Sequence, residues 1–404
     1  MSVFNNNIEP SAPKIEFQEV KVIGVGGAGG QALNLLCTKG VANVDLIACN
    51  TDIQDLNRNL APIHIILGKT VLGGRGAGNN PVVGKEAAIE NISEVEEILD
   101  APTVAIDGKT SMVIVVAGMG GGTGTGAAPE IAKAAKDRGI LTLGVVITPY
   151  IDEGRLRLQQ AEDGIKRMKE NVDALIIIDN EKTNEYCNCG IKKAYEQINT
   201  ILVNAVIAIT DISTKKGEIN IDFNDISSTM KNSGRALIGI GAANGEGRDL
   251  KAIKAALDSP LLRDNNINGA QKAIIVLSTN ESEEIFQLTI PERNHIMKYL
   301  NESAGDNIPK IWGMMSEPSL NEDLRVVIIV TGFEEGDIPG EPDIPIPVNP
   351  NAPIIFPQIK EEVVVDTDYF SKNGSFNKEN YSYLKDTNTI ENNIDKIENF
   401  ETKS

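Results

Sequence analysis

The stretch Gly118-Met119-Gly120-Gly121-Gly122-Thr123-Gly124-Thr125-Gly126 (GMGGGTGTG) places six glycines within nine positions, directly after the apolar run Val113 to Ala117. Ordering a glycine costs conformational entropy, so such a run between two regular elements indicates tight turning or close approach of a ligand to the backbone. A flexible linker is the alternative, but linkers are rarely held between a buried strand and a helix. We therefore interpret the stretch as a ligand-binding turn that opens a helix.

A second glycine stretch, Gly24 to Gly30 (GVGGAGG), follows a predicted strand, Val20 to Ile23, and precedes a predicted helix, Gln31 to Leu36. It satisfies the dinucleotide pattern GxGxxG with Asp45 about 20 residues on, so an NAD-dependent enzyme is one hypothesis. Asp45, however, precedes the apolar run LIAC, whereas a ribose-binding acid should stand at the strand end, which is occupied by Asn50, Thr51 and Asp52. Two helix amino termini that face one ligand favour a triphosphate.

Other glycine turns are less specific. Two GKT sequences, at Lys69 and Lys109, imitate the end of a P-loop, but Ile63 and Thr103 stand where the leading glycine belongs. We expect both lysines on solvated turns. A third glycine turn, Gly73 to Pro81, lies where the next strand end is expected. It is either a mobile surface loop or, in company with the other two turns, a lid on the nucleotide.

The composition bounds the class of protein. A chain of 404 residues, 41% of them hydrophobic, has room for two globular domains. A net charge of −19 argues against binding nucleic acid or an anionic membrane. The chain contains no apolar run of about 20 residues and starts without a signal-like segment, which predicts a cytoplasmic protein with no membrane insertion. Four scattered cysteines predict neither a disulfide framework nor a metal site, the pair Cys187 and Cys189 included.

The order of patterns predicts the fold class. Strands alternate with helices through the first half, which indicates an α/β domain with a parallel sheet that is covered on both faces. A buried helix follows at Ile191 to Ile212, and then a second, α+β unit with its own apolar set. Low hydrophobicity beyond about Glu334 predicts disorder. The predicted organisation is a disordered tail (1–17), a nucleotide-binding domain (18–190), a central helix (191–215), an α+β domain (216–334) and a disordered acidic tail (335–404).

The motifs VIGVGGAGG, CNTDIQ, GAGNNP, GMGGGTGTGAAP, DEGRLR, INIDFND, SPLL and LRVVIIVTGF occur in this order between Val20 and Phe333. With them the chain resembles the tubulin/FtsZ family of GTPases, and the similarity implies a tubulin-like fold, GTP and GDP as ligands, and Mg²⁺. Residues implied to bind the phosphates and the magnesium are Gly27, Ala28, Gly29, Gly30, Gln31, Asn50, Ala77, Gly78, Gly122, Thr123 and Gly124. No side chain is assigned as a metal ligand.

The resemblance also implies contacts to the rest of the nucleotide. Glu153 and Arg157 match ribose and phosphate contacts, although from spacing alone they form an ordinary i, i+4 ion pair. Tyr195 matches a ring that stacks on guanine, and Asn199 matches a group that hydrogen-bonds its edge; guanine preference is expected to depend on Asn180 too. An Asp at position 199 could accept two hydrogen bonds from guanine, whereas Asn199 accepts only through one oxygen.

The segment INIDFND bears on catalysis. From sequence alone, Asp222 and Asp225 cap a helix. The resemblance implies instead that one subunit presents Asp222, Asp225 and Asn220 to the nucleotide of the next, where they orient the attacking water. Hydrolysis would then be coupled to head-to-tail assembly into filaments that form the division ring of a bacterial cell. A nucleotide-binding filament without efficient hydrolysis is the alternative.

The carboxyl terminus departs from the pattern of the family. Many relatives end in a short apolar and basic peptide that docks membrane-tethering division proteins, but this chain closes as NNIDKIENFETKS. The apolar patch Pro353 to Pro357 is a second candidate for docking, and a chance apolar cluster in a linker is its alternative. The resemblance implies tethering partners at the mid-cell division site, without identifying them.

Overall fold

The computed structural model describes residues 19–41, 43–102, 109–181, 190–215, 217–259, 267, 269–282, 284–304 and 308–333. The two predicted tails, 1–17 and 335–404, lie outside these ranges, as do Cys187 and Cys189. Within them, no helix is long and apolar enough to cross a bilayer.

The first half of the chain alternates strands and helices, as the sequence predicts. Its inner strands are short runs of Val, Ile, Leu and Ala that are buried on both faces, as expected for a covered parallel sheet. The elements are β1 (Glu19–Val25), α1 (Gly26–Lys39), β2 (Val44–Asn50), α2 (Ile53–Asn57), β3 (Ile63–Ile66), α3 (Pro81–Glu90), α4 (Ile92–Asp100), β4 (Thr110–Gly118), α5 (Gly122–Asp137), β5 (Leu141–Ile147), α6 (Arg155–Asn171) and β6 (Ala174–Ile178).

The second half begins with the long helix α8 (Ile191–Thr214), which ends two residues beyond the predicted Ile212. An α+β unit follows, with its own core between its strands and the helices α10 and α11. Its elements are α9 (Phe223–Met230), β7 (Gly234–Ala243), α10 (Arg248–Leu257), β8 (Lys272–Thr279), α11 (Ile290–Ala304), β9 (Lys310–Ser316) and β10 (Leu324–Thr331).

The strand order is β3-β2-β1-β4-β5-β6-β7-β10-β8-β9. The first six strands are parallel and in doubly wound order, so the direction of winding reverses between β1 and β4. In such sheets, ligands bind at the carboxyl ends of the strands where this reversal occurs. Both glycine stretches follow these two strands. Strand β7 joins the second unit to the first through two residue pairs with β6 and then pairs antiparallel with β10.

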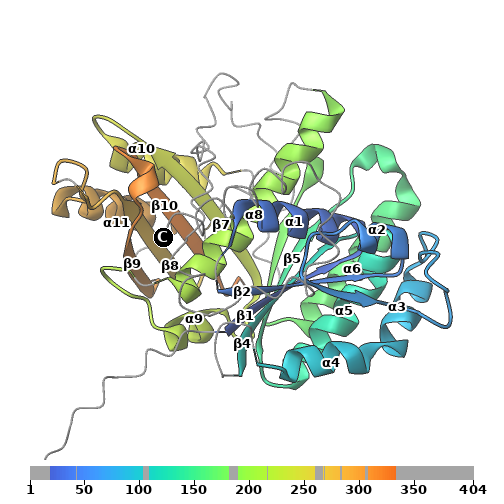
Figure 1. The fold of residues 1–404 in the computed structure, drawn as a ribbon. Helices are drawn as coiled ribbons and strands as arrows, with labels where there is room; N and C mark the ends of the chain where they lie inside the picture. The colour runs from blue at the N-terminus through green and yellow to red at the C-terminus, as the bar shows by residue number, and fades with distance from the viewer. Residues whose placement is uncertain are drawn as a thin grey trace, which may run out of the picture. The chain divides into compact units, whose positions relative to one another are not determined.

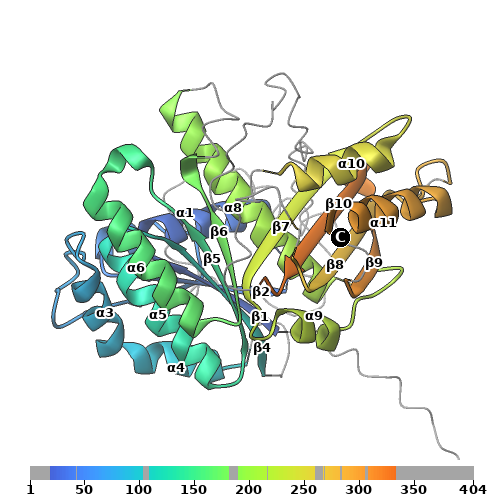
Figure 2. The same ribbon diagram turned by 180° about the vertical axis from the view of Figure 1, so that it is seen from behind.

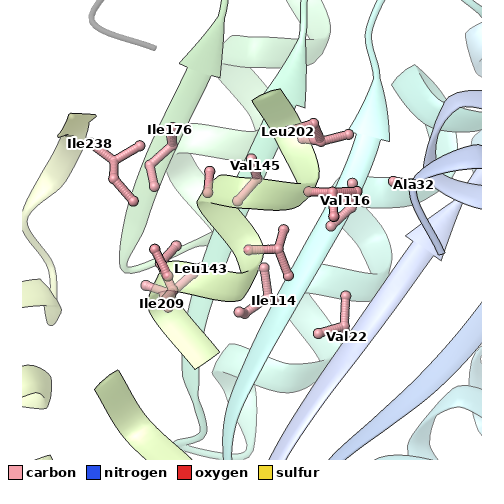
Figure 3. Packing of buried hydrophobic residues seen from close by; sticks show 14 of the residues in the cluster. Val22, Ala32, Ile114, Val116, Leu143, Val145, Ile176, Leu202, Ile209 and Ile238 are labelled. Carbon is pink, nitrogen blue, oxygen red and sulfur yellow. The ribbon is translucent and has the colours of Figure 1, made fainter. Parts of the chain in front are cut away.

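Helices cover both faces of the parallel sheet (Figures 1 and 2). One face packs on α1 and α8, and the other packs on α3, α4, α5 and α6. Buried residues of α8 share one hydrophobic cluster with residues of β7, β8 and β10, as expected for a long buried helix. Figure 3 shows Leu202 beside Val116, late in β4, and Ile209 beside Leu143, early in β5. The helix therefore runs antiparallel to the strands, from their carboxyl ends toward their amino ends.

The predicted start of the first helix is wrong. Helix α1 begins at Gly26, directly after β1, and not at Gln31. Gly26 has a φ of 72°, which lets the chain turn without a connecting loop. A side chain at Gly29 would collide with the carbonyl of Val116, at 2.4 Å, so the glycine lets helix and sheet approach closely. The residues Gly27 to Gly30 are thus the first turns of a helix.

Candidate functional site

Two helix amino termini lie side by side at the point where the winding of the sheet reverses. Helices α1 and α5 begin after β1 and β4, and neither N-cap residue, Val25 or Gly121, has a side chain that accepts a capping hydrogen bond. A Cβ atom built on Gly26 would lie 3.2 Å from the backbone nitrogen of Gly124, so the two first turns are in contact. Uncapped N–H groups and two helix dipoles make this place suited to an anion with several charges.

Most positions of the 118–126 stretch that hold glycine have no room for a side chain, because neighbouring protein atoms lie too close. A Cβ atom at Gly124 would lie 2.3 Å from the carbonyl of Gly118, and one at Gly126 would lie 2.1 Å from the carbonyl of Pro81. Gly122 is similarly close to Ala77, at 2.9 Å. Only at Gly121 is the nearest atom as far as 4.0 Å. The run is therefore dense mainly because α5 packs tightly on its surroundings, and its N-cap, Gly121, is the position with room for a side chain.

The turn from Gly73 to Asn80 is held by backbone hydrogen bonds. The nitrogen of Ile53 donates to the carbonyl of Gly74 (3.2 Å), and the nitrogen of Gly76 donates to that of Thr51 (3.1 Å). Ala77 is buried against Gly122, which brings the predicted phosphate residues Ala77 and Gly78 to the start of α5. The turn thus belongs to the site.

Polar side chains at the end of β2 complete this edge of the sheet. Asn50 is buried, and its Oδ1 atom accepts a hydrogen bond from the nitrogen of Asp52 (3.2 Å). The Oγ1 atoms of Thr51 and Thr123 lie 2.6 Å apart. The sequence reading assigns a role to Thr123 and none to Thr51, because sequence spacing gives no sign that residues 72 positions apart meet.

The central helix reaches the same place. The Nδ2 atom of Asn199 donates to Oε1 of Gln31 (3.2 Å), so two predicted nucleotide residues are in contact. Tyr195 lies one turn earlier on α8, and its side chain is outside the described part of the chain. Amide groups from α1 and α8 therefore meet beside the first turn of α1.

Glu153 ends a short 3₁₀ turn (Ile151–Glu153) just before α6, and Arg157 lies in the first turn of α6. They form an ion pair (3.0 Å from Oε2 to Nε), as their i, i+4 spacing alone predicts. Glu153 also accepts a hydrogen bond from the nitrogen of Tyr150 (2.8 Å). Arg157 covers the turn before α5, since a side chain at Gly120 would lie 2.9 Å from its Cγ atom. Asn180 is buried after β6, and its backbone nitrogen donates a hydrogen bond to the hydroxyl of Thr148 (3.4 Å).

The predicted catalytic residues lie in a different part of the molecule. Asp222 is the N-cap of α9, and its Oδ1 atom accepts from the nitrogen of Asn224 (2.9 Å), so it does cap a helix. Asn220 accepts from the nitrogen of Gly217 (2.6 Å). The carboxylate of Asp225 stands in the first turn of the same helix, and all three of these side chains are exposed.

Helix α8 separates this segment from the glycine loops. Asn199 contacts the start of α1, whereas Thr214, fifteen residues later, stands about 22 Å further along the helix axis. After α9, the nitrogen of Gly234 donates to the carbonyl of Asp173 (3.0 Å), directly before β6 starts. Figure 1 shows α9 on the side where β1 and β2 start. The carboxylates therefore belong to the amino edge of the parallel sheet, and the glycine loops belong to its carboxyl edge.

Two residues that suggest other functions from sequence alone form structural contacts instead. Asp45, the candidate ribose ligand of a dinucleotide enzyme, forms a buried ion pair with Lys21 (3.1 Å), near the amino end of β2. Lys69, from one of the GKT sequences, lies on a surface turn and pairs with Glu94 (2.7 Å). The ion-pair hydrogen bond from Lys69 lowers the pKa of Glu94. Both residues are thus occupied by structural contacts away from the glycine loops.

Comparisons with known proteins agree with this architecture. The model of the Tubulin/FtsZ family, GTPase domain, matches residues 19–188, and that of the FtsZ family, C-terminal domain, matches residues 234–334. Cell division protein FtsZ 1 of Pyrococcus horikoshii is 39% identical over 351 residues, which cover 86% of this chain and 90% of the relative. The protein of the same name from Thermococcus kodakarensis is 40% identical over 78% of this chain and 80% of its own length.

Solved structures are similar as well. The structure titled FtsZ dimer, empty, from M. jannaschii aligns with a TM-score of 0.71 and 36% identity, over 79% of this chain and 89% of that one. CetZ1 from Haloferax volcanii, in a GDP-bound monomer, aligns with a TM-score of 0.67 over 79% of this chain and 95% of its own. At 24% identity, the second match shows a shared fold alone.

Proposed function

Because the chain belongs to the tubulin/FtsZ family of GTPases, we propose that it hydrolyses GTP at a site that two subunits complete in a head-to-tail filament, and that it acts in cell division. One observation carries the proposal. The glycine loops lie at the carboxyl edge of the parallel sheet, and the carboxylates of Asp222 and Asp225 lie at its amino edge. A head-to-tail contact juxtaposes these two edges from different copies.

The residues at the carboxyl edge fit a nucleoside triphosphate. Uncapped N–H groups of α1 and α5 supply donors, Thr123 adds a hydroxyl, and no atom comes closer than 4.0 Å to a Cβ atom built on Gly121. Asn180 and Asn199 offer amide groups for the base, and Gln31 of the first phosphate loop contacts Asn199. Mg²⁺ would bind through the phosphates and water, with Asn50 and the turn at Ala77 and Gly78 nearby, and would neutralise charge on the phosphates.

The carboxylates supply what the glycine loops lack. Hydrolysis needs a water that is positioned in line with the terminal phosphate, and backbone N–H groups do not accept its protons. Exposed carboxylates at Asp222 and Asp225, with the amide of Asn220 beside them, accept hydrogen bonds and orient such a water. On this proposal, a subunit alone binds GTP, and turnover requires the next subunit.

The relatives support the wider role. Two of them carry the name cell division protein, and the M. jannaschii structure is titled a dimer. We infer that this chain self-associates and works at the division site in the cytoplasm. Contacts to membrane-tethering proteins are assigned to the tail, residues 335–404, which lies outside the described part of the chain.

Mixing two inactive variants tests the shared site. Gly121→Asp places a carboxylate where the phosphates would bind, while Asp is a favoured N-cap residue and its Cβ atom has room. Asp225→Asn keeps the nucleotide edge and removes a carboxylate from the other edge. We expect each variant alone to release little phosphate, and an equimolar mixture with GTP and Mg²⁺ to regain turnover, because one partner supplies the nucleotide and the other the carboxylate.

The controls separate this result from misfolding. Gly121→Asn introduces the same shape and a neutral cap, so it should bind GTP better than Gly121→Asp. Melting curves should show both parent variants folded. A mixture as inactive as its parts, with Asp225→Asn still binding GTP, would exclude the shared site. Purification of the wild-type chain with bound NAD would instead favour the dinucleotide enzyme.

A further inference from the structure

A buried hydroxyl, that of Thr51, lies behind the Thr123 hydroxyl that the site offers to a phosphate. Thr51 follows β2 and is fully buried, and its Oγ1 atom lies 2.6 Å from Oγ1 of Thr123. Its carbonyl accepts from the nitrogen of Gly76 (3.1 Å), so the backbone of Thr51 is held by the glycine turn. Thr123 is partly exposed and stands in the uncapped first turn of α5.

The direction of the hydrogen bond between the two hydroxyls decides what Thr123 can do. Each hydroxyl has a single hydrogen atom to donate, and it accepts through its lone pairs. If Thr123 donates to Thr51, it has no hydrogen left for a ligand. If Thr51 donates to Thr123, the hydrogen of Thr123 is free to point into the space at the start of α5. A phosphate oxygen there only accepts, so only the second arrangement satisfies all three groups.

We propose that Thr51 is a positioning residue, which donates to Thr123 and thereby directs the Thr123 hydroxyl toward a phosphate of the bound nucleotide. This inference rests on the proposed function, which makes the anion a nucleotide phosphate. A chain of donors that runs in one direction, Thr51 to Thr123 to phosphate, also polarises its last hydrogen bond. Thr51 itself stays buried behind Thr123 and does not touch the ligand.

A double-mutant cycle in the full-length protein tests the chain of donors. Thr51→Val and Thr123→Val each keep the volume and remove one hydroxyl. We expect each to weaken GTP binding about tenfold, the effect of a lost hydrogen bond to a charged group. The double variant should also be about tenfold weaker, and not a hundredfold, because Thr51 acts on the ligand only through the Thr123 hydroxyl. Thr51→Ser restores the hydroxyl and should bind within about twofold of the wild type.

Controls distinguish positioning from general stability. Thr142 is also fully buried, and its hydroxyl donates to the carbonyl of Ile140 (2.9 Å). Thr142→Val should leave GTP affinity unchanged, even if its melting temperature falls. Wild-type affinity in Thr51→Val, or effects of the two substitutions that multiply in the double variant, would overturn the proposal.

A second probe separates the inference from the function on which it rests. Inorganic tripolyphosphate carries the phosphates without a base or a sugar, and the same cycle is measured with it. If the wild type binds tripolyphosphate but not GTP, the proposed function fails while the same coupling between Thr51 and Thr123 still supports the positioning role. If the wild type binds neither, both proposals fail.

Discussion

The two edges of the parallel sheet are built in opposite ways. At the carboxyl edge, the candidate binding surface is mostly backbone, and its glycines are fixed because helices and strands contact one another at distances that exclude side chains. At the amino edge, the segment from Asn220 to Asp225 is exposed and offers side-chain oxygens. The comparison teaches that substitutions of the closely packed glycines at the first edge act on the fold, whereas substitutions of the exposed carboxylates at the second edge act on chemistry.

The largest expected effect is on the packing behind the glycine loops. Gly126→Ala would place a Cβ atom 2.1 Å from the carbonyl of Pro81 and 2.6 Å from the nitrogen of Lys85, so α3 and α5 must move apart. We expect a loss of about 3 kcal/mol in the free energy of unfolding, as for an overpacked core. Urea unfolding measures the change. Gly121→Ala is the matched control, because its nearest neighbour is 4.0 Å away, and a comparable loss in both would refute the packing explanation.

The next largest effect is on turnover at the other edge. Asp222→Asn and Asp225→Asn should each lower kcat about a hundredfold, since an amide orients water less well than a carboxylate that accepts its protons. Asn is as good an N-cap as Asp, so Asp222→Asn preserves the cap that the structure shows and isolates the charge. Phosphate release and GTP binding are measured in parallel.

A matched variant for these carboxylates stands in the same segment. Glu218→Gln removes an exposed carboxylate two residues before Asn220, and turnover should stay near the wild-type level. Loss of GTP binding in Asp222→Asn or Asp225→Asn would contradict the division of labour between the edges, as would equal losses of kcat in all three variants.

The sequence predicts the fold and the carboxyl edge of the candidate site better than it predicts the role of the amino edge. Alternating apolar runs predict the parallel sheet, because burial on both faces requires continuous Val, Ile and Leu. The glycine stretches predict the turns at β1 and β4, but not that α1 begins at Gly26, since helix boundaries follow from contacts such as that between Gly29 and Val116. Propensity alone does not report such contacts.

Pairings across the fold are also invisible to local patterns. The hydroxyls of Thr51 and Thr123 and the amides of Gln31 and Asn199 meet only because β1, β2 and β4 are neighbours and α8 crosses the sheet. The local pattern at Asp222 predicts a cap, and the structure shows that cap. Its catalytic role comes from the resemblance and stays a prediction, because it depends on a second copy of the chain.

A smaller effect is expected on base selectivity at the carboxyl edge. Guanine has two donors on the edge that a carboxylate reads, whereas inosine lacks the 2-amino group. Asn199 donates to Gln31 through Nδ2 and has one oxygen left to accept. Asn199→Asp adds an acceptor, so we expect the ratio of GTP affinity to ITP affinity to rise about tenfold, the equivalent of about one hydrogen bond. Competition binding measures the ratio.

A control variant tests whether a negative charge near the base site is enough to change the ratio of GTP to ITP affinity. Thr200→Asp adds the same charge at the next position of α8, where the native hydroxyl donates to the carbonyl of Glu196 in the same helix. The ratio of GTP to ITP affinity should not change in that variant. An unchanged ratio in Asn199→Asp would remove residue 199 from the base site.

The smallest expected effect is on the reactivity of two cysteines. The rate at Cys49, compared with that at Cys37, reports how often the carboxyl edge opens. Burial raises the pKa of Cys49 to about 12 and that of Cys37 to about 11. A folded-state pKa above the ordinary value means that both thiols stay protonated below pH 9. Their contribution to stability is fully present there and is lost as the pH rises from 9 toward 12, because only the unfolded thiols ionise easily. Cys49 directly precedes Asn50 and is 1% exposed, whereas Cys37 is partly exposed.

Alkylation at pH 8, in a background in which Cys187 and Cys189 are replaced by Ser, should therefore modify Cys37 first. Cys49 should react only through opening of the structure, and GTP should slow it further, since a ligand at Asn50 and the loops beside it stabilises the closed state. Mass spectrometry of each peptide gives the two rates. Equal rates for both cysteines, or a rate at Cys49 that GTP does not change, would contradict this prediction. Either result would show that the carboxyl edge opens independently of its ligand.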